Sequence, residues 1–185
     1  YRVPRVVHDV AMNIVGRISN RIYKEWKPRV HEGALSYYHD FQTIDMSQGE
    51  WLVLGRTRHM LNDLENVLYS KGLFYKNKFK KAYEQDLYDA ISDWEGARKG
   101  KPLNSDQITR IASYMSPNHY QKEEIRYLDK DAFYSVDELF DKRGLKTKKV
   151  WYEALDQAPE ERVRYIRRMR ENGEQLNKDP RILLS

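Results

Sequence analysis

The sequence predicts an α/β fold that carries a mainly α-helical inserted domain. The apolar run Trp51–Leu54 is typical of a strand in a parallel sheet, whose two faces are usually covered. A helical stripe of apolar residues follows over 58–71 and ends at Gly72, a residue favoured just after a helix. Residues 181–184 predict a strand after a long helical stretch. A strand that returns after helices is explained most simply if those helices are inserted into the first domain.

The chain opens with a predicted helix that runs from Pro4 to about Tyr23. Proline suits the first turn of a helix, where its missing N–H would have no partner. Residues 24–32 are polar and predict a loop, and residues 34–39 predict a short strand. The apolar side chains at helical spacing in the first segment are Val7, Val10, Ile14 and Ile18.

A second strand is predicted at residues 73–75, directly after Gly72. Strand, helix and strand in this order predict a parallel α/β unit. We expect its strands to lie between the helices of residues 4–23 and 58–71. Residues 182–184 are expected to join the same sheet.

Beyond Tyr75 the sequence predicts helices and loops until the last strand. A basic stretch comes first, formed by Lys76, Lys78, Lys80 and Lys81. The expected helices are one holding Tyr83 to Trp94 and broken from Gly96, one of residues 105–115 capped by Ser105, and those of residues 131–140, 149–157 and 160–171.

Composition excludes some classes of site. The 185 residues include no cysteine, so disulfides and thiolate metal sites are ruled out, and a reducing compartment such as the cytoplasm is compatible. The net charge of +5 is mildly basic and leaves a nucleic-acid partner open. The apolar runs are far shorter than the roughly 20 residues of a membrane span, so no membrane association is expected. The first residues show no signal peptide and no initiator Met, and we expect the chain to start inside a longer protein.

Few catalytic motifs can be argued from the residues alone. The five histidines have no metal-ligand spacing, and no Gly-Lys-Ser/Thr phosphate loop is present. No Ser–His–Asp or paired-carboxylate arrangement follows from spacing either.

Three features, in this order, resemble UvrD/Rep-type superfamily 1 DNA helicases. Tyr1-Arg2-Val3-Pro4 before a helix is similar to the Asn-Tyr-Arg-Ser motif that opens the second RecA-like domain. Residues 51–57 (Trp-Leu-Val-Leu-Gly-Arg-Thr), a helix and residues 72–75 (Gly-Leu-Phe-Tyr) resemble the family's "strand, Arg-Thr-Asn, helix, Gly-Ile-x-Tyr" block. The family then inserts a mainly helical domain, called 2B, before a strand that leads into a Thr-x-His-x-x-Lys-Gly motif. Arg58 stands where the family has Asn, and the Gly-Ile-Gly signature that some relatives use against duplex DNA is absent.

The resemblance implies a domain organisation. Residues 1–79 would be part of the second RecA-like (2A) domain, residues 80–179 a helical 2B-type insertion, and residues 180–185 the strand that returns to the RecA-like domain. The fold class expected is therefore α/β, a partial RecA-like parallel sheet with an inserted helical domain.

It also implies roles for five residues. Arg2 would reach the γ-phosphate of ATP as the catalytic arginine, because a guanidinium matches phosphate oxygens and stays charged. Tyr1 would stack on adenine. Arg56 and Thr57 would contact the backbone of single-stranded DNA, and Arg58 would add a second charge there.

The implied parent protein is an ATP-dependent 3′–5′ DNA helicase or translocase of repair, replication or recombination. ATP and Mg²⁺ are the cofactors expected of the full-length protein, and no cofactor is expected in this chain alone. Expected partners are single-stranded DNA, single/double-strand junctions and proteins that meet the helical insertion. The location expected is the bacterial cytoplasm, or the host cytoplasm for a phage protein. Two alternatives stay open, a non-enzymatic nucleic-acid- or partner-binding module and the helicase part of a nuclease-helicase.

The same residues have purely structural interpretations. Arg56 could pair with a neighbouring acid while Thr57 caps the following helix. The arginines of residues 160–171 are more often the exposed basic face of a packed helix than a nucleic-acid contact. The basic stretch from Lys76 to Lys81 carries the same two interpretations.

Overall fold

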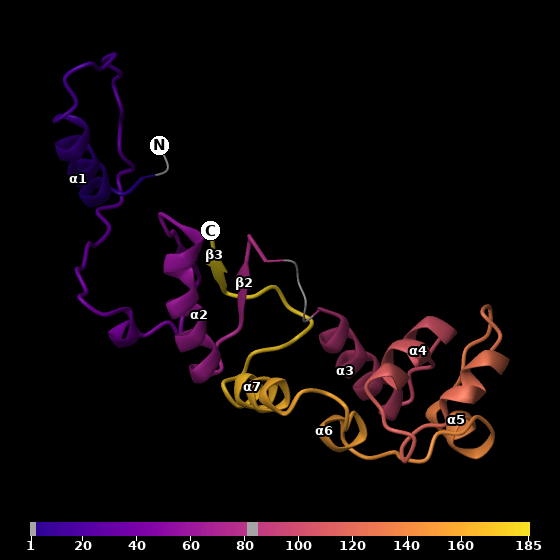
Figure 1. Ribbon diagram of the computed structural model, residues 1–185. Helices are drawn as coiled ribbons and strands as arrows, with labels where there is room; N and C mark the ends of the chain where they lie inside the picture. The colour runs from indigo at the N-terminus through magenta and orange to yellow at the C-terminus, as the bar shows by residue number, and fades with distance from the viewer. Residues whose placement is uncertain (1–2, 81–84) are drawn as a thin grey trace. The chain divides into compact units, whose positions relative to one another are not determined.

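The computed structural model describes residues 3–80 and 85–185. The chain has an α/β fold in which helices predominate (Figure 1). Its small parallel sheet is formed by strands that are far apart in the sequence. It divides into two compact units, residues 1–44 and 45–185. The predicted domains, residues 1–79, 80–179 and 180–185, describe where a helical domain is inserted into another domain. The division into compact units does not test this, so these domains stay a prediction.

The first unit holds one α-helix, α1 (Arg5–Val15), and a short 3-10 helix, η1 (Phe41–Thr43). The prediction that the first helix reaches Tyr23 is wrong, because α1 ends before Gly16. Glycine costs about 1 kcal/mol in a helix relative to alanine, and no residue of α1 is buried, so no core packing offsets that cost.

The strand predicted at residues 34–39 is absent from this unit. The segment is exposed and pairs with no other strand in the part of the chain that the structure describes. A strand is stabilised by a hydrogen-bonded neighbour, and alternation of residue types in the sequence cannot supply one.

The second unit contains a sheet of three strands, β1 (Trp51–Val53), β2 (Tyr75–Asn77) and β3 (Ile182–Leu184). The order is β1-β3-β2, and both pairings are parallel. The prediction that residues 182–184 join the sheet is confirmed, and they form its central strand.

The second strand lies two residues later than predicted. Leu73 and Phe74 are 5% and 6% exposed, and the carbonyl of Leu73 accepts a hydrogen bond of 2.8 Å from the hydroxyl of Tyr165. These apolar residues therefore pack against helices, and pairing with β3 begins only at Tyr75.

Helix α2 (Arg58–Lys71) has the predicted bounds and runs alongside β2 and β3 (Figure 1). Gly72 follows it with φ of 66°, as expected for a left-handed C-terminal residue. The side chain of Asn77 donates to Glu65 of α2 at 3.1 Å, so α2 covers the sheet face to which Asn77 belongs. Ile182 and Leu184 are fully buried on that face.

The opposite face of the sheet carries Leu52, Leu54 and Leu183, which are 62%, 73% and 38% exposed. The expectation that both faces are covered is therefore not met within residues 45–185. Cover by the predicted helix of residues 4–23 stays a prediction.

The remaining helices surround a second core. They are α3 (Gln85–Arg98), α4 (Ser105–Ser113), η2 (Lys122–Tyr127), α5 (Val136–Lys142), α6 (Trp151–Ala154) and α7 (Glu160–Glu171). Fully buried side chains at its centre include Ile91, Trp94, Met115 and Ile166. Large apolar side chains from every helix of this part explain why the sequence predicts helices and no sheet here.

Some predicted helix bounds in this part need correction. Helix α3 continues through Gly96 to Arg98. The cap of α4 is Asn104, not Ser105, because Asn104 and Gln107 satisfy each other's backbone N–H groups in a capping box.

Two later helices are shorter than predicted. Helix α5 starts at Val136 rather than residue 131, because Tyr134 pairs with Leu103 and the Ser135 hydroxyl caps the helix. Helix α6 covers only Trp151–Ala154 of the predicted residues 149–157.

Helix α7 joins the helical part to the sheet by capping α2. The last carbonyls of a helix have no partner within it. Asn172 donates to the carbonyls of Lys71 and Gly72 at 2.8 and 2.9 Å, and Arg168 donates to the carbonyl of Ser70. The C-terminal end of α2 is therefore fixed by residues about a hundred positions later in the chain.

No helix in the described part of the chain combines the length and apolar composition needed to cross a membrane.

Candidate functional site

The carboxyl ends of all three strands meet at one edge of the sheet, because the strands are parallel. The N–H of Gly55 donates to the Ser185 carbonyl, and the N–H of Lys78 donates to the Leu184 carbonyl, both at 3.0 Å. We name the residues at this place the carboxyl edge, namely residues 54–58, 78–80 and 185. Parallel α/β sheets bind ligands at this edge, which makes it the candidate site.

Arg56 and Thr57 lie at the carboxyl edge where β1 turns into α2, and both are exposed. Thr57 precedes the helix but makes no side-chain capping bond, and the first turn of α2 contains no acidic residue. Arg56 makes no hydrogen bond or ion pair with any residue that the structure describes. Among the described residues, Arg56 therefore does not pair with an acid, and Thr57 does not cap the helix. The N-terminal end of α2, which carries partial positive charge, has no acidic side chain in its first turn and lies next to the guanidinium of Arg56.

Arg58 lies at the same edge but has a partner. Its guanidinium carbon is 4.8 Å from the centroid of the Phe79 ring, within the range of a cation–π contact. The expected second charge is thus present and held against an aromatic residue that follows β2.

Sequence reasoning missed Phe79. The residue is 42% exposed although it is large and apolar. A signal existed, because Phe79 stands between Lys78 and Lys80, and an aromatic residue interleaved with cations is typical of single-stranded nucleic-acid binding.

The lysines of the predicted basic stretch have different surroundings in the structure. Lys76 and Lys78 are exposed, whereas Lys80 forms an ion pair with the buried carboxylate of Glu65. Lys81 lies outside the described residues. Only part of the basic stretch is therefore free to meet a ligand.

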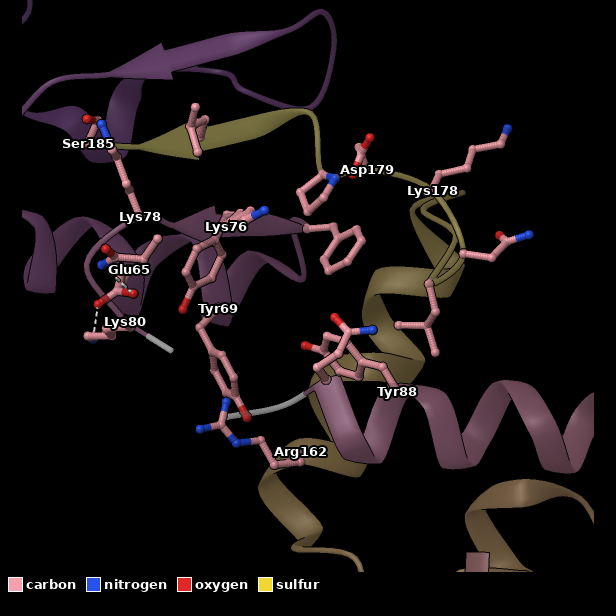
Figure 2. A pocket seen from close by; sticks show the side chains of 18 of the residues that line it. Glu65, Tyr69, Lys76, Lys78, Lys80, Tyr88, Arg162, Lys178, Asp179 and Ser185 are labelled. Atoms are coloured by element: carbon pink, nitrogen blue, oxygen red, sulfur yellow. Dashed lines mark hydrogen bonds and ion pairs between the residues drawn. The ribbon is translucent and has the colours of Figure 1, made fainter. Parts of the chain in front are cut away.

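A cleft of about 1480 Å³ begins at the carboxyl edge and follows β2 toward the helical part (Figure 2). Its basic lining residues are Lys76, Lys78, Lys80, Arg162 and Lys178, and its acidic ones are Glu65, Asp89, Glu161 and Asp179. Because charges of both signs line it, the cleft as a whole is not an anion channel. Of the cations that line the cleft, Lys78 and Lys80 belong to the carboxyl edge.

Tyrosines form the wall of this cleft where it meets α7. Tyr69 stacks on Tyr165 with ring centroids 4.3 Å apart. The guanidinium carbon of Arg162 is 5.1 Å from the centroid of Tyr69, and Figure 2 shows these two side chains at the cleft. Burial raises the pKa of Tyr69 above its ordinary value, and burial together with the Glu65 carboxylate raises that of Tyr75. Both phenols are therefore neutral at physiological pH, and Tyr69 contributes a stacked ring to the wall.

The arginines of α7 have intramolecular partners. Arg164 lies 3.8 Å from Glu160, and Arg168 bonds to α2. The rest contact aromatic rings, namely Arg162 on Tyr69, Arg167 on Tyr152 and Arg170 on Trp151. These contacts support the structural interpretation of the basic helix.

Two predicted site residues, Tyr1 and Arg2, lie outside the described residues. The ATP-binding role expected of them is therefore untested by the geometry. Within the described ranges, no group of three histidine, aspartate or glutamate side chains is placed to hold a metal ion.

Comparisons with protein-family models, curated proteins and solved structures found no match.

Proposed function

We propose that this chain is part of an ATP-dependent DNA helicase or translocase that moves 3′ to 5′ along single-stranded DNA. The chain would supply part of the second RecA-like domain, with residues 80–179 as its helical insertion. Its direct task would be to bind the DNA backbone at the carboxyl edge. The phosphate loop and the Mg²⁺ ligands would come from other segments of the full-length cytoplasmic protein.

One observation carries this proposal. Strand β3 follows the helical part of the chain and yet lies between β1 and β2. This topology is what an insertion into one sheet produces, and the resemblance to UvrD/Rep-type helicases implies such an insertion. The free Arg56 at the end of β1 stands where that resemblance expects a DNA contact.

The chemistry of the carboxyl edge supports an anionic chain as the ligand. A guanidinium offers several N–H donors in one plane to phosphate oxygens. The first amides of α2 add partial positive charge, and neither an acid nor the Thr57 side chain neutralises them. Lys78 brings another exposed cation to the same edge. Backbone phosphates would be bound here without regard to base sequence.

The nucleotide side of the proposal depends on Arg2 and Tyr1. Arg2 would stabilise the charge that develops on the transferred phosphoryl group, and Tyr1 would stack on the base. Mg²⁺, when bound with ATP, would supply charge neutralisation, and its ligands would come from other segments of the full-length protein. The sequence contains no phosphate loop for the nucleotide, so this chain contributes to hydrolysis only as a partner of another domain.

The test uses the full-length protein. We expect ATP hydrolysis that single-stranded DNA stimulates, and unwinding of a duplex with a 3′ single-stranded tail. Arg2→Ala should abolish hydrolysis while single-stranded DNA binding persists. DNA binding without any DNA-stimulated hydrolysis would instead support the non-enzymatic binding module.

A further inference from the structure

Phe79 is an exposed aromatic residue at the carboxyl edge. It lies two residues after the end of β2, and 42% of its surface is exposed while Arg58 lies against its ring. A phenylalanine gains stability chiefly from burial. A partly exposed ring with a fixed position is therefore a candidate for contact with a ligand.

A set of polar contacts fixes this position. The side-chain oxygen of Asn77 accepts a hydrogen bond of 2.9 Å from the N–H of Phe79. The amide of Asn77 donates in turn to Glu65 at 3.1 Å, and Lys80 pairs with the same carboxylate. Glu65 is only 5% exposed, so a buried charge anchors the turn that presents Phe79. Figure 2 shows Glu65 beside Lys80 at one end of the cleft.

The neighbours of Phe79 define the ligand chemistry. Arg56 and Lys78 are exposed cations on either side of the edge, one after β1 and one after β2. A flat apolar ring at an edge that also carries exposed cations suits an aromatic group with flanking negative charges. Single-stranded nucleic acid has this chemistry, because unpaired bases stack on aromatic side chains while lysine and arginine contact the phosphates.

We propose that Phe79 is a stacking platform for an unpaired base, with Arg56 and Lys78 contacting the phosphates beside that base. Arg58 holds the ring in place. This inference rests on the proposed function, and it adds a base contact to the phosphate contacts at the carboxyl edge. Stacking is tolerant of sequence because every base has an aromatic face.

The experiment compares two strands with the 185-residue chain. One is a fluorescent oligothymidine, and the other is a strand of equal length whose sugars carry no bases. Both have the same phosphates, so their difference in affinity reports base contacts. We expect the wild-type chain to bind oligothymidine at least about fivefold more tightly, the lower end for stacking of one base on an aromatic side chain.

Four variants separate the contacts. Phe79→Leu should reduce oligothymidine binding to near the level of the baseless strand, and Phe79→Trp should preserve the difference. Arg56→Ala should weaken both strands equally. Phe133→Leu is the matched control, because Phe133 is also exposed, at 66%, and lies in the helical part. Circular dichroism should show all four variants folded, since these side chains are partly exposed.

The outcomes distinguish the two proposals. If the wild-type chain binds neither strand, the DNA-binding function fails and the stacking inference fails with it. If Arg56→Ala weakens binding but Phe79→Leu changes neither strand, the DNA-binding function stands and Phe79 is not a platform. Equal wild-type affinity for both strands also overturns the inference. If Phe79→Trp loses the difference as Phe79→Leu does, ring stacking is likewise rejected.

Discussion

Leu184 lies directly opposite Val53 in a parallel strand pair, although the whole helical part of the chain separates the two residues. On its other side Leu184 pairs with Asn77. The last strand therefore joins the first two, and the carboxyl edge exists only once residues 182–184 are in place. This makes the last strand a test of the architecture.

Leu184→Ala should lower the free energy of unfolding by about 2–5 kcal/mol, because Leu184 is fully buried and a cavity would remain. The neighbouring Leu183→Ala should cost under about 1 kcal/mol, since Leu183 points to the opposite, partly exposed face. Urea denaturation measures both. Similar costs for the two variants would contradict the burial pattern of β3.

Glu65→Ala should destabilise the chain by about 1–3 kcal/mol, because the part-buried side-chain amide of Asn77 would lose its hydrogen bond to the Glu65 carboxylate. Lys80 is largely exposed and can return to water. Asp63→Ala on the exposed side of the same helix is the control and should cost less than about 0.5 kcal/mol. Thermal unfolding compares the pair, and equal midpoints would show that the Glu65 anchor is dispensable.

The buried phenol of Tyr120 should make the chain less stable at alkaline pH. Burial raises the pKa of Tyr120 to about 12, and its hydroxyl has no hydrogen-bond partner among the described residues. The folded state thus favours the neutral phenol, so stability is complete below the unfolded pKa near 10 and falls as pH rises from there toward 12.

Tyr120→Phe should match the wild-type stability at pH 8 within about 1 kcal/mol, because an unpaired buried hydroxyl is replaced by an apolar group of the same shape. At pH 11 the variant should have lost about 1 kcal/mol less than the wild-type chain. Urea titrations at both pH values provide the comparison. Parallel losses in the two proteins would argue against a raised pKa at this position.

The strand predictions are confirmed where an apolar segment also has a neighbouring strand to pair with. Residues 51–53 and 182–184 form strands as expected, and α2 has the predicted bounds because Gly72 marks its end with a left-handed φ. Residues 73–74 mislead because an apolar pair can pack against a helix as readily as it can join a strand. Only the tertiary contact with Tyr165 decides between the two.

The candidate site was predicted in part. The Arg56 position followed from a strand-to-helix turn, a local pattern. The Arg58–Phe79 contact joins two turns that come together only when β3 lies between β1 and β2, so no local pattern contains it. The fixed position of Phe79 depends likewise on Glu65, which is twelve residues from Asn77.

The 185-residue chain alone should show no ATP hydrolysis, with or without single-stranded DNA. The reason is chemical, because the sequence has no phosphate loop to bind the triphosphate. Steady-state phosphate release is the assay, with the full-length protein as positive control. Activity that co-purifies with the chain and disappears in Arg2→Ala would overturn this expectation.

In the proposed function, the carboxyl edge binds the backbone of single-stranded DNA through Arg56. Fluorescence anisotropy of two oligonucleotides of different base composition, titrated with salt, measures this contact. Arg56→Ala should weaken both equally and flatten the log–log salt dependence by roughly 0.7, the single-strand value per neutralised phosphate. Arg126→Ala, an exposed arginine of the helical part, should leave the slope unchanged. An unchanged slope and affinity in Arg56→Ala would contradict the claim.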